Sequence, residues 1–284
     1  MKKLFTERVG IFFMRTTTYL VVAVIGWILL DIIIKGIPGL SWEFLSTAPR
    51  RSGAEGGILP AIVGTVYLLL GTLIIALPLG IASAIYLSEY AQKGRFRNYV
   101  KRGIITLAGV PSIVFGLFGL GLFVIYLNFG ASILAGSLTL ACMTLPTIIV
   151  ASEEALKAVP RSFREASLAL GATKWETIKY NVLPYSIPGM LTGSILAIGR
   201  AAGETAPILL TVAAFYLPRF PSSVFDQVMV LPYHLYILAT QHPEAALIRD
   251  KQYGTALVLL IIVLGFNLIA VLYRRRFRKK YQWN

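Results

Sequence analysis

The chain has 284 residues, of which 56% are hydrophobic and only 14% are charged. Soluble domains carry roughly a quarter charged residues, so this composition excludes a soluble globular protein and indicates a polytopic membrane protein. The net charge of +14 suggests nucleic-acid binding, but the basic residues cluster between apolar runs; we therefore expect contact with membrane lipid and no nucleic-acid partner.

Six apolar runs predict six transmembrane helices, because a bilayer core of about 30 Å needs about 20 apolar helical residues. Backbone groups in lipid must be paired within each segment, so we expect an all-α fold in a single transmembrane domain over residues 1–284. The first run is longer than a usual signal-peptide core and lacks a small-x-small cleavage site, which favours an uncleaved span. The runs cover residues 16–34, 60–88, 102–128, 132–152, 187–215 and 254–273.

A few polar residues and prolines interrupt the early runs. Asp31 lies in the first run and Lys35 follows one turn later, a spacing that predicts a structural ion pair. Pro78 and Pro111 predict either kinks in the second and third runs or the points where helices begin.

The distribution of lysine and arginine predicts the orientation of the chain. Of the 27 basic residues, 20 fall on the side of the two termini and 6 on the other side. Cytoplasmic segments are enriched in basic residues, so we expect both termini in the cytoplasm. The basic tail over residues 274–280 is more typical of stop-transfer and lipid-headgroup contacts than of a binding site for another molecule.

Two long segments are expected on the outer side, over residues 36–59 and 216–253. The aromatic, amphipathic stretch 225–239 either lies flat at the membrane interface or dips back into it. His234 and His242 have no nearby cysteine or carboxylate cluster in the sequence, so we interpret them as interfacial polar residues and expect no metal site.

The polar segment 153–184 is too long for a simple turn and predicts two short helices. The first, from Glu165, is expected to end at Gly171, where a left-handed backbone is easy. The second is expected to end at Pro184. A short exposed helix at the end of a bundle can serve as a docking site for another protein. The alternative is a solvated loop with no binding role.

Within this segment, EASLALG followed after nine residues by NVLP resembles the EAA loop of permease subunits of ABC importers. Ser167 stands where that pattern has its second alanine, and Asn181 stands where it has isoleucine. The resemblance implies that the short helix docks into a groove on a separate ATPase subunit and follows its closure. The residues that match the coupling motif are Glu165, Ala166, Gly171, Leu183 and Pro184.

The fifth run carries two charges, Arg200 and Glu204, which we expect one turn apart on one face of a continuous helix. A charge at mid-bilayer costs about 2.5–3.5 kcal/mol on insertion scales, so such residues usually face a cavity or a partner. Two interpretations stay open: a structural pair, or a translocation path in which the guanidinium grips an oxyanion at two points.

Four glycines of the fifth run form two small-xxx-small pairs, which allow another helix to approach closely. We expect this surface to lie at the interface with a second permease subunit. The glycines are Gly189, Gly193, Gly199 and Gly203.

The stretches REASLALGATKWET and GRAAGETAPILLT together are similar to PstA-type permeases of phosphate-specific ABC importers. This resemblance covers most of the chain and implies import of inorganic phosphate across the cytoplasmic membrane of a bacterium or archaeon. It also implies three kinds of partner: a PstC-type permease, two ATPase copies and an external phosphate-binding protein. Arg200 and Glu204 match the charged positions of that family.

Two alternatives remain: a permease for another oxyanion, such as molybdate or phosphonate, and a membrane protein without a transport role. An enzyme would need a convergent acid, base or metal cluster, and the sequence indicates none. The chain also lacks a Walker sequence, so we expect no cofactor, no catalytic residue, and ATP hydrolysis by a partner. Its single cysteine, Cys142, allows no intrachain disulfide.

Overall fold

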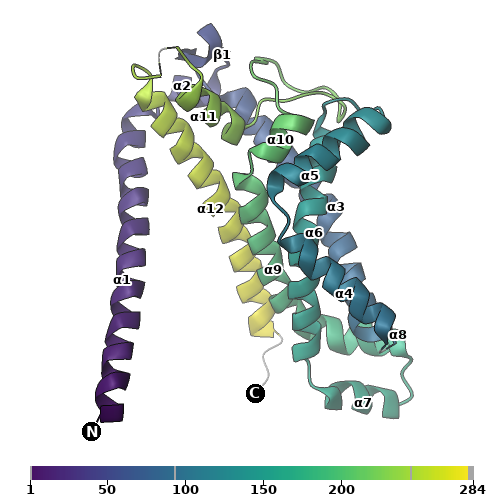
Figure 1. Ribbon diagram of the computed structural model, residues 1–284. Helices are drawn as coiled ribbons and strands as arrows, with labels where there is room; N and C mark the ends of the chain where they lie inside the picture. Colours follow the sequence, from purple (N-terminus) through teal and green to yellow (C-terminus); the bar gives the residue numbers. More distant parts are fainter. Residues whose placement is uncertain (1, 93, 244, 281–284) are drawn as a thin grey trace.

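Long apolar runs form long helices in this chain, because a backbone in lipid can pair its polar groups only within helices or closed barrels. The structure is a computed structural model that describes residues 2–92, 94–243 and 245–280. Helices dominate it and only one sheet of two short strands is present in the described ranges, which confirms the all-α class (Figure 1). The long helices are α1 (Lys2–Gly36), α3 (Leu59–Ile85), α6 (Ile133–Ala158), α9 (Leu183–Gly203) and α12 (Arg249–Lys280).

Five helices of the described chain are long and apolar enough to cross a membrane, and there are up to six spans if a bent pair is one of them. A π-helical segment, Tyr86–Tyr90, continues α3 directly and extends the second span. Four predicted runs coincide with single helices of this kind, the third of them to within one residue: 16–34, 60–88, 132–152 and 254–273.

The third predicted run is a bent pair of helices rather than a straight span. α4 (Arg95–Ala108) meets α5 (Ser112–Gly119), which continues into the π-helical segment Leu120–Tyr126, at an angle of 103°. Pro111 lies at the bend and explains it, because proline disfavours the helical conformation of the residue before it. Of the two alternatives for Pro111, the start of a new helix is therefore correct.

Small elements close one end of the bundle, where α1 begins and α12 ends (Figure 1). They are α7 (Arg161–Ala169), α8 (Lys174–Glu176) and the π-helical segment Thr177–Val182. We call this end the α7 end.

The opposite end, which we call the α11 end, holds the two long segments between spans (Figure 1). Within the predicted amphipathic stretch 225–239 only the second part is helical, as α11 (Leu231–Thr240), and α10 (Ala206–Thr211) lies nearby. The segment before α3 contributes the 3-10 turns Ile37–Gly39 and Arg51–Gly53, the helix α2 (Trp42–Ser46), and the antiparallel strands β1 (Pro49–Arg50) and β2 (Glu55–Gly56).

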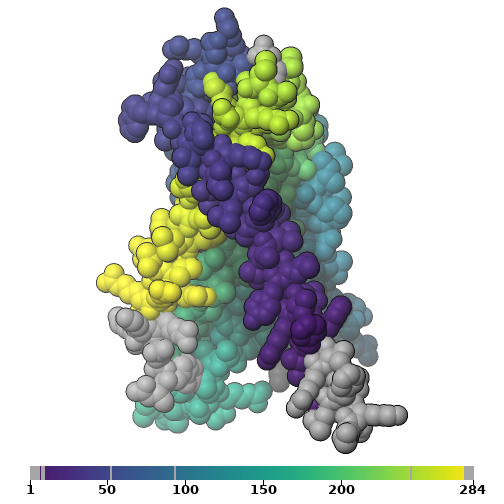
Figure 2. Space-filling model, turned by 90° about the vertical axis from the view of Figure 1, so that its left-hand side faces the viewer, coloured from purple at the N-terminus to yellow at the C-terminus, as the bar shows by residue number. Residues whose placement is uncertain are grey.

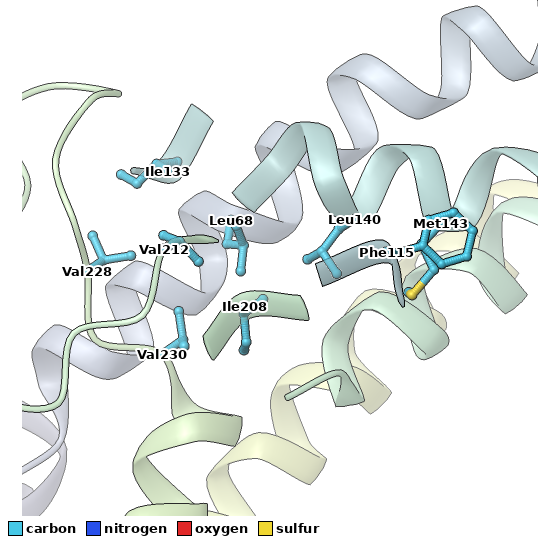
Figure 3. Close-up of a cluster of buried hydrophobic side chains, with 9 residues drawn as sticks. All are labelled: Leu68, Phe115, Ile133, Leu140, Met143, Ile208, Val212, Val228 and Val230. Carbon is cyan, nitrogen blue, oxygen red and sulfur yellow. The ribbon is translucent and has the colours of Figure 1, made fainter. Parts of the chain in front are cut away.

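The core follows the packing of α3 on α6, of α6 on α9 and of α9 on α12. Toward the α11 end, nine buried apolar side chains from α3, α5, α6, α10 and the chain after α10 converge (Figure 3). Burial of each such side chain contributes about 1.5–3 kcal/mol, so this cluster holds the bent pair and the broken fifth span against α6. Its members are Leu68, Phe115, Ile133, Leu140, Met143, Ile208, Val212, Val228 and Val230.

Helix α1 stands apart from the bundle over much of its length. It touches α12 near the α11 end, where a Cβ added at Gly36 would lie 2.8 Å from the carbonyl oxygen of Tyr253, and the two helices diverge toward the α7 end (Figures 1 and 2). Lys35 Nζ lies 2.6 Å from Asp31 Oδ1, which confirms the predicted pair. The side chain of Trp27 is 74% exposed, so this apolar face is suited to lipid or to another membrane protein.

Candidate functional site

Arg200 and Glu204 lie at a break in the fifth span. Helix α9 ends at Gly203, Glu204 has an extended backbone (φ −74°, ψ 137°), and α10 begins at Ala206. Pro207 explains the break, because it has no N–H for the carbonyl of Gly203 four residues earlier and its ring would clash with that carbonyl. The expectation of one continuous helix with both charges on its face is therefore wrong.

The two charges nevertheless stay close to each other. Arg200 Nε lies 3.8 Å from Glu204 Oε1, farther than the roughly 2.7–3.2 Å of a hydrogen bond. The side chains are 34% and 17% exposed, respectively. The guanidinium is thus held loosely, and its donors remain available to another acceptor.

The side of α9 that carries Arg200 is open. Leu196, one turn earlier, is 60% exposed, and a Cβ added at Gly203 would meet nothing within 4 Å. Irregular backbone and charges at membrane depth are tolerated against protein or a water-filled cavity, and not against lipid. This face is therefore suited to a partner protein or an aqueous path.

The four glycines of the fifth span divide into two pairs with different surroundings. Gly189 and Gly193 face α6, where an added Cβ would collide with the side chains of Ala155 (2.6 Å away) and Ala151, respectively. Gly203 has open space beside it, and a Cβ added at Gly199 would meet Asn267 Nδ2 of α12 at 3.8 Å. The first pair thus serves packing within this chain, Gly199 lies next to α12, and Gly203 remains for the expected subunit interface.

Asn267 of α12 is a polar neighbour of this region that the sequence analysis missed. Its Nδ2 would lie 3.8 Å from a Cβ at Gly199, and its Oδ1 is buried without a hydrogen bond. Polar side chains inside spans are costly and commonly functional, so an asparagine within the run LGFNLIAV was the available signal.

The turn after α7 has the predicted geometry. Gly171 adopts the left-handed region with φ +85° and ends the helical stretch. The next helix begins with a capping box, in which the Thr173 N–H donates to Glu176 Oε2 at 2.8 Å and the Glu176 N–H donates to Thr173 Oγ1 at 3.3 Å. The positive φ of Gly171 on one side and the capping box on the other therefore fix the conformation of this turn.

Pro184 does not end the second short helix, so that expectation is wrong. It lies with Leu183 where the π-helical segment Thr177–Val182 passes into α9, and helical structure runs without a break from Lys174 to Gly203. On the other side of the segment, α6 continues to Ala158. The polar loop is consequently shorter than the predicted 153–184.

The outer surface of α7 and its turn presents several exposed side chains. Glu165 and Ala166 are exposed, Leu168 is 50% exposed, and Leu170 is 89% exposed. Exposed apolar side chains beside a carboxylate are typical of a protein-binding surface.

The two departures from the EAA pattern face the inner side of α7. Ser167 is buried and its hydroxyl accepts a hydrogen bond from Thr177 Oγ1 at 3.0 Å, which ties α7 to the segment after α8. Asn181 helps to line a hollow of about 550 Å³ beside α7.

Two buried carboxylates near the α7 end were also missed. Glu153 of α6 pairs with Lys101 and lies 3.5 Å from Arg97 Nη2, so it joins α6 to α4. Glu89 pairs with Arg164 of α7. Both pairs join residues far apart in sequence, which spacing alone does not reveal.

His234 lies buried in α11, and burial lowers its pKa to about 4, so the imidazole is neutral at pH 7. No group of three or more histidine, cysteine or carboxylate side chains arranged to hold a metal ion occurs among the described residues.

Comparison with known families gives a match over residues 76–283 to the family described as "Binding-protein-dependent transport system inner membrane component". The chain is 36% identical over 253 residues to "Probable ABC transporter permease protein YqgI" of Bacillus subtilis, with 84% of this chain and 85% of that protein covered. It is 34% identical over 273 residues to "Phosphate transport system permease protein PstA" of Mycobacterium leprae, with 94% and 88% covered.

Solved structures share the fold at low sequence identity. A bacterial alginate ABC transporter in complex with an alginate-bound periplasmic protein matches with a TM-score of 0.65 and 15% identity, covering 92% of this chain and 94% of that one. An inward-facing form of the MetNI methionine ABC transporter matches with a TM-score of 0.57 and 16% identity, covering 78% and 94%.

Proposed function

Because this chain belongs to the family of binding-protein-dependent transport system inner membrane components, we propose that it is a permease subunit of an importer of inorganic phosphate. It is a membrane transport subunit rather than an enzyme. The relatives named as phosphate transport permeases support phosphate as the substrate.

The position of Arg200 is the main evidence for an anion path through this subunit. It lies at a helix break, on an open face of α9, with only a loose contact to Glu204. An anion that crosses about 30 Å of low dielectric needs a positive group to offset the loss of its water. Glu204 competes for the same guanidinium, which keeps the site weak enough for the anion to leave.

A second permease, of the PstC type, covers the open face of α9. Gly203 leaves room there for a neighbouring helix to approach closely. The translocation path then runs between the two subunits, with Arg200 on its wall and Asn267 close by.

A separate ATPase docks on α7. The exposed Leu168 and Leu170 supply apolar contact area, and Glu165 supplies a charge for an arginine or lysine of the ATPase. Helical structure runs from Lys174, shortly after α7, through Leu183 and Pro184 to Gly203, so movement of α7 also reaches the span that carries Arg200.

The α7 end faces the cytoplasm in this proposal, because most basic residues of the chain lie there. With Cys142→Ser as background, Lys174→Cys is expected to react with an impermeant thiol reagent only from the cytoplasmic side and Ser222→Cys only from outside. The measurement is labelling of intact cells against inverted vesicles. Reaction of Lys174→Cys in intact cells would reverse the orientation and remove the ATPase from α7.

Uptake by the reconstituted complex tests the substrate. This chain, a second permease, the ATPase and the external binding protein are placed in proteoliposomes and supplied with ATP. We expect ATP-dependent accumulation of labelled phosphate that excess sulfate or molybdate does not inhibit. Accumulation of molybdate or a phosphonate instead would assign the chain to another oxyanion, and no accumulation of any of them would contradict a transport role.

A further inference from the structure

One side chain, Arg164, joins α7 to the end of α3. Its Nη2 donates to Glu89 Oε1 at 2.7 Å and its Nε donates to Glu89 Oε2 at 3.2 Å, so the contact has two points. The two side chains are only 20% and 9% exposed. Charge-assisted pairs with this geometry are among the strongest and most directional hydrogen bonds in proteins.

The same guanidinium also holds the end of α6. Its Nη1 donates to the carbonyl oxygen of Val159 at 2.7 Å, and its Nη2 donates to that of Leu156 at 2.9 Å. The last carbonyls of a helix have no partner within the helix, so these bonds satisfy groups that would otherwise need water. Arg164 therefore fixes three elements, α7, α3 and α6, to one another.

The helices that Arg164 reaches, α3 and α6, pack closely on each other. A Cβ added at Gly80 of α3 would lie 2.6 Å from Ile148 Cγ2 of α6, which shows how close the two helices come. Closely packed protein interiors have low compressibility, so a displacement of one helix is passed on to its neighbour. Toward α9, α7 is linked by the neutral hydrogen bond between Thr177 and Ser167 and by an edge contact between the rings of Phe163 and Tyr185, whose centroids lie 5.2 Å apart. Neutral hydrogen bonds are roughly half as strong as charge-assisted ones.

We propose that Arg164 is a positioning residue through which movement of α7 reaches α3 and α6 together, by way of its ion pair with Glu89. This inference rests on the proposed function, in which α7 receives the stroke of the ATPase. Without the pair, α7 still docks and stays bonded to the end of α6, but its displacement no longer reaches α3 and α6 together.

Glu89→Gln tests the inference most cleanly, because glutamine keeps the size of the side chain and leaves the bonds from Arg164 to the α6 carbonyls in place. We expect the complex to assemble with its ATPase and phosphate uptake per ATP hydrolysed to fall about tenfold. The matched control is Glu154→Gln, which removes a carboxylate paired with Lys157 on the exposed side of α6 and should leave the ratio unchanged. A merely structural role would lower the amount of assembled complex and not the ratio.

A reversible cross-link provides the second measurement. In a Cys142→Ser background, Glu89→Cys with Arg164→Cys should import poorly, and bridging the two thiols with a reducible bifunctional reagent should restore uptake several-fold. Loss of uptake on bridging, or no recovery, would mean that the two elements must move apart and would overturn the inference.

Wild-type uptake separates the inference from the function on which it rests. If the wild-type complex imports no oxyanion, the proposed function fails. If it imports phosphate and Glu89→Gln keeps the wild-type ratio per assembled complex, only the role of Arg164 is overturned.

Discussion

Arg200→Ala is expected to reduce the initial rate of phosphate uptake in proteoliposomes by roughly a hundredfold. Hydrogen bonds to charged groups are each worth about 1.5–3 kcal/mol, so losing two of them to the anion costs at least about 3 kcal/mol. A change of that size corresponds to roughly a hundredfold in rate. Arg200→Lys keeps the charge but loses the two-point geometry and should retain part of the uptake.

The double variant Arg200→Ala, Glu204→Ala distinguishes a path residue from a structural pair. Arg200→Ala alone leaves Glu204, which is 17% exposed, without its cation, and an unpaired buried charge costs about 1–3 kcal/mol or more. Removing both charges should restore thermal stability and ATPase association without restoring uptake. If uptake also returns, the pair is structural and the anion path does not depend on it.

Gly171→Val is expected to lower both ATPase association and uptake by at least about tenfold. The residue has φ +85°, where a β-branched side chain costs roughly 1–2 kcal/mol or forces the turn to change. An added Cβ meets nothing within 4 Å, so the effect is conformational and not a steric clash. Co-purification of the ATPase with the tagged chain and the uptake rate measure it.

Gly130→Val is the matched control, because Gly130 also has a positive φ, +67°, and open space around it, but lies in the chain just before α6 and away from α7. It should cost similar backbone energy and leave ATPase association intact. Gly171→Asn should be tolerated, since asparagine visits the left-handed region more easily. Equal loss of association in Gly130→Val and Gly171→Val would show that general destabilisation, rather than the coupling turn, is responsible.

The sequence predicted those local features of the structure that a single physical constraint determines. The apolar runs had to become helices, because a backbone in lipid has no water to pair with. The left-handed turn at Gly171 was predictable because helices commonly end at a glycine in this conformation. The pair Asp31–Lys35 followed from helical spacing alone.

The errors in the sequence analysis concern prolines, whose effect depends on where in a helix they lie. Pro184 was expected to end a helix, but helical structure continues past it from the π-helical segment Thr177–Val182 into α9. Pro207 was placed inside a continuous span, but α9 ends at Gly203, four residues earlier. Pro78, Pro146 and Pro188 lie inside helices that continue past them, so a proline alone did not identify this break.

The sequence by itself determined the membrane class, most of the apolar helices, the left-handed turn at Gly171 and the presence of a charged pair in the fifth span, because each depends on residues within a few turns of one another. Only the tertiary structure decided which glycines of the fifth span face α6. It also decided that Asn267 lies beside Gly199, near Arg200, and that Arg164 pairs with Glu89, which is 75 positions earlier in the chain. Contacts of that kind depend on how distant helices pack, and the packing is the sum of many weak apolar contacts that no local pattern encodes.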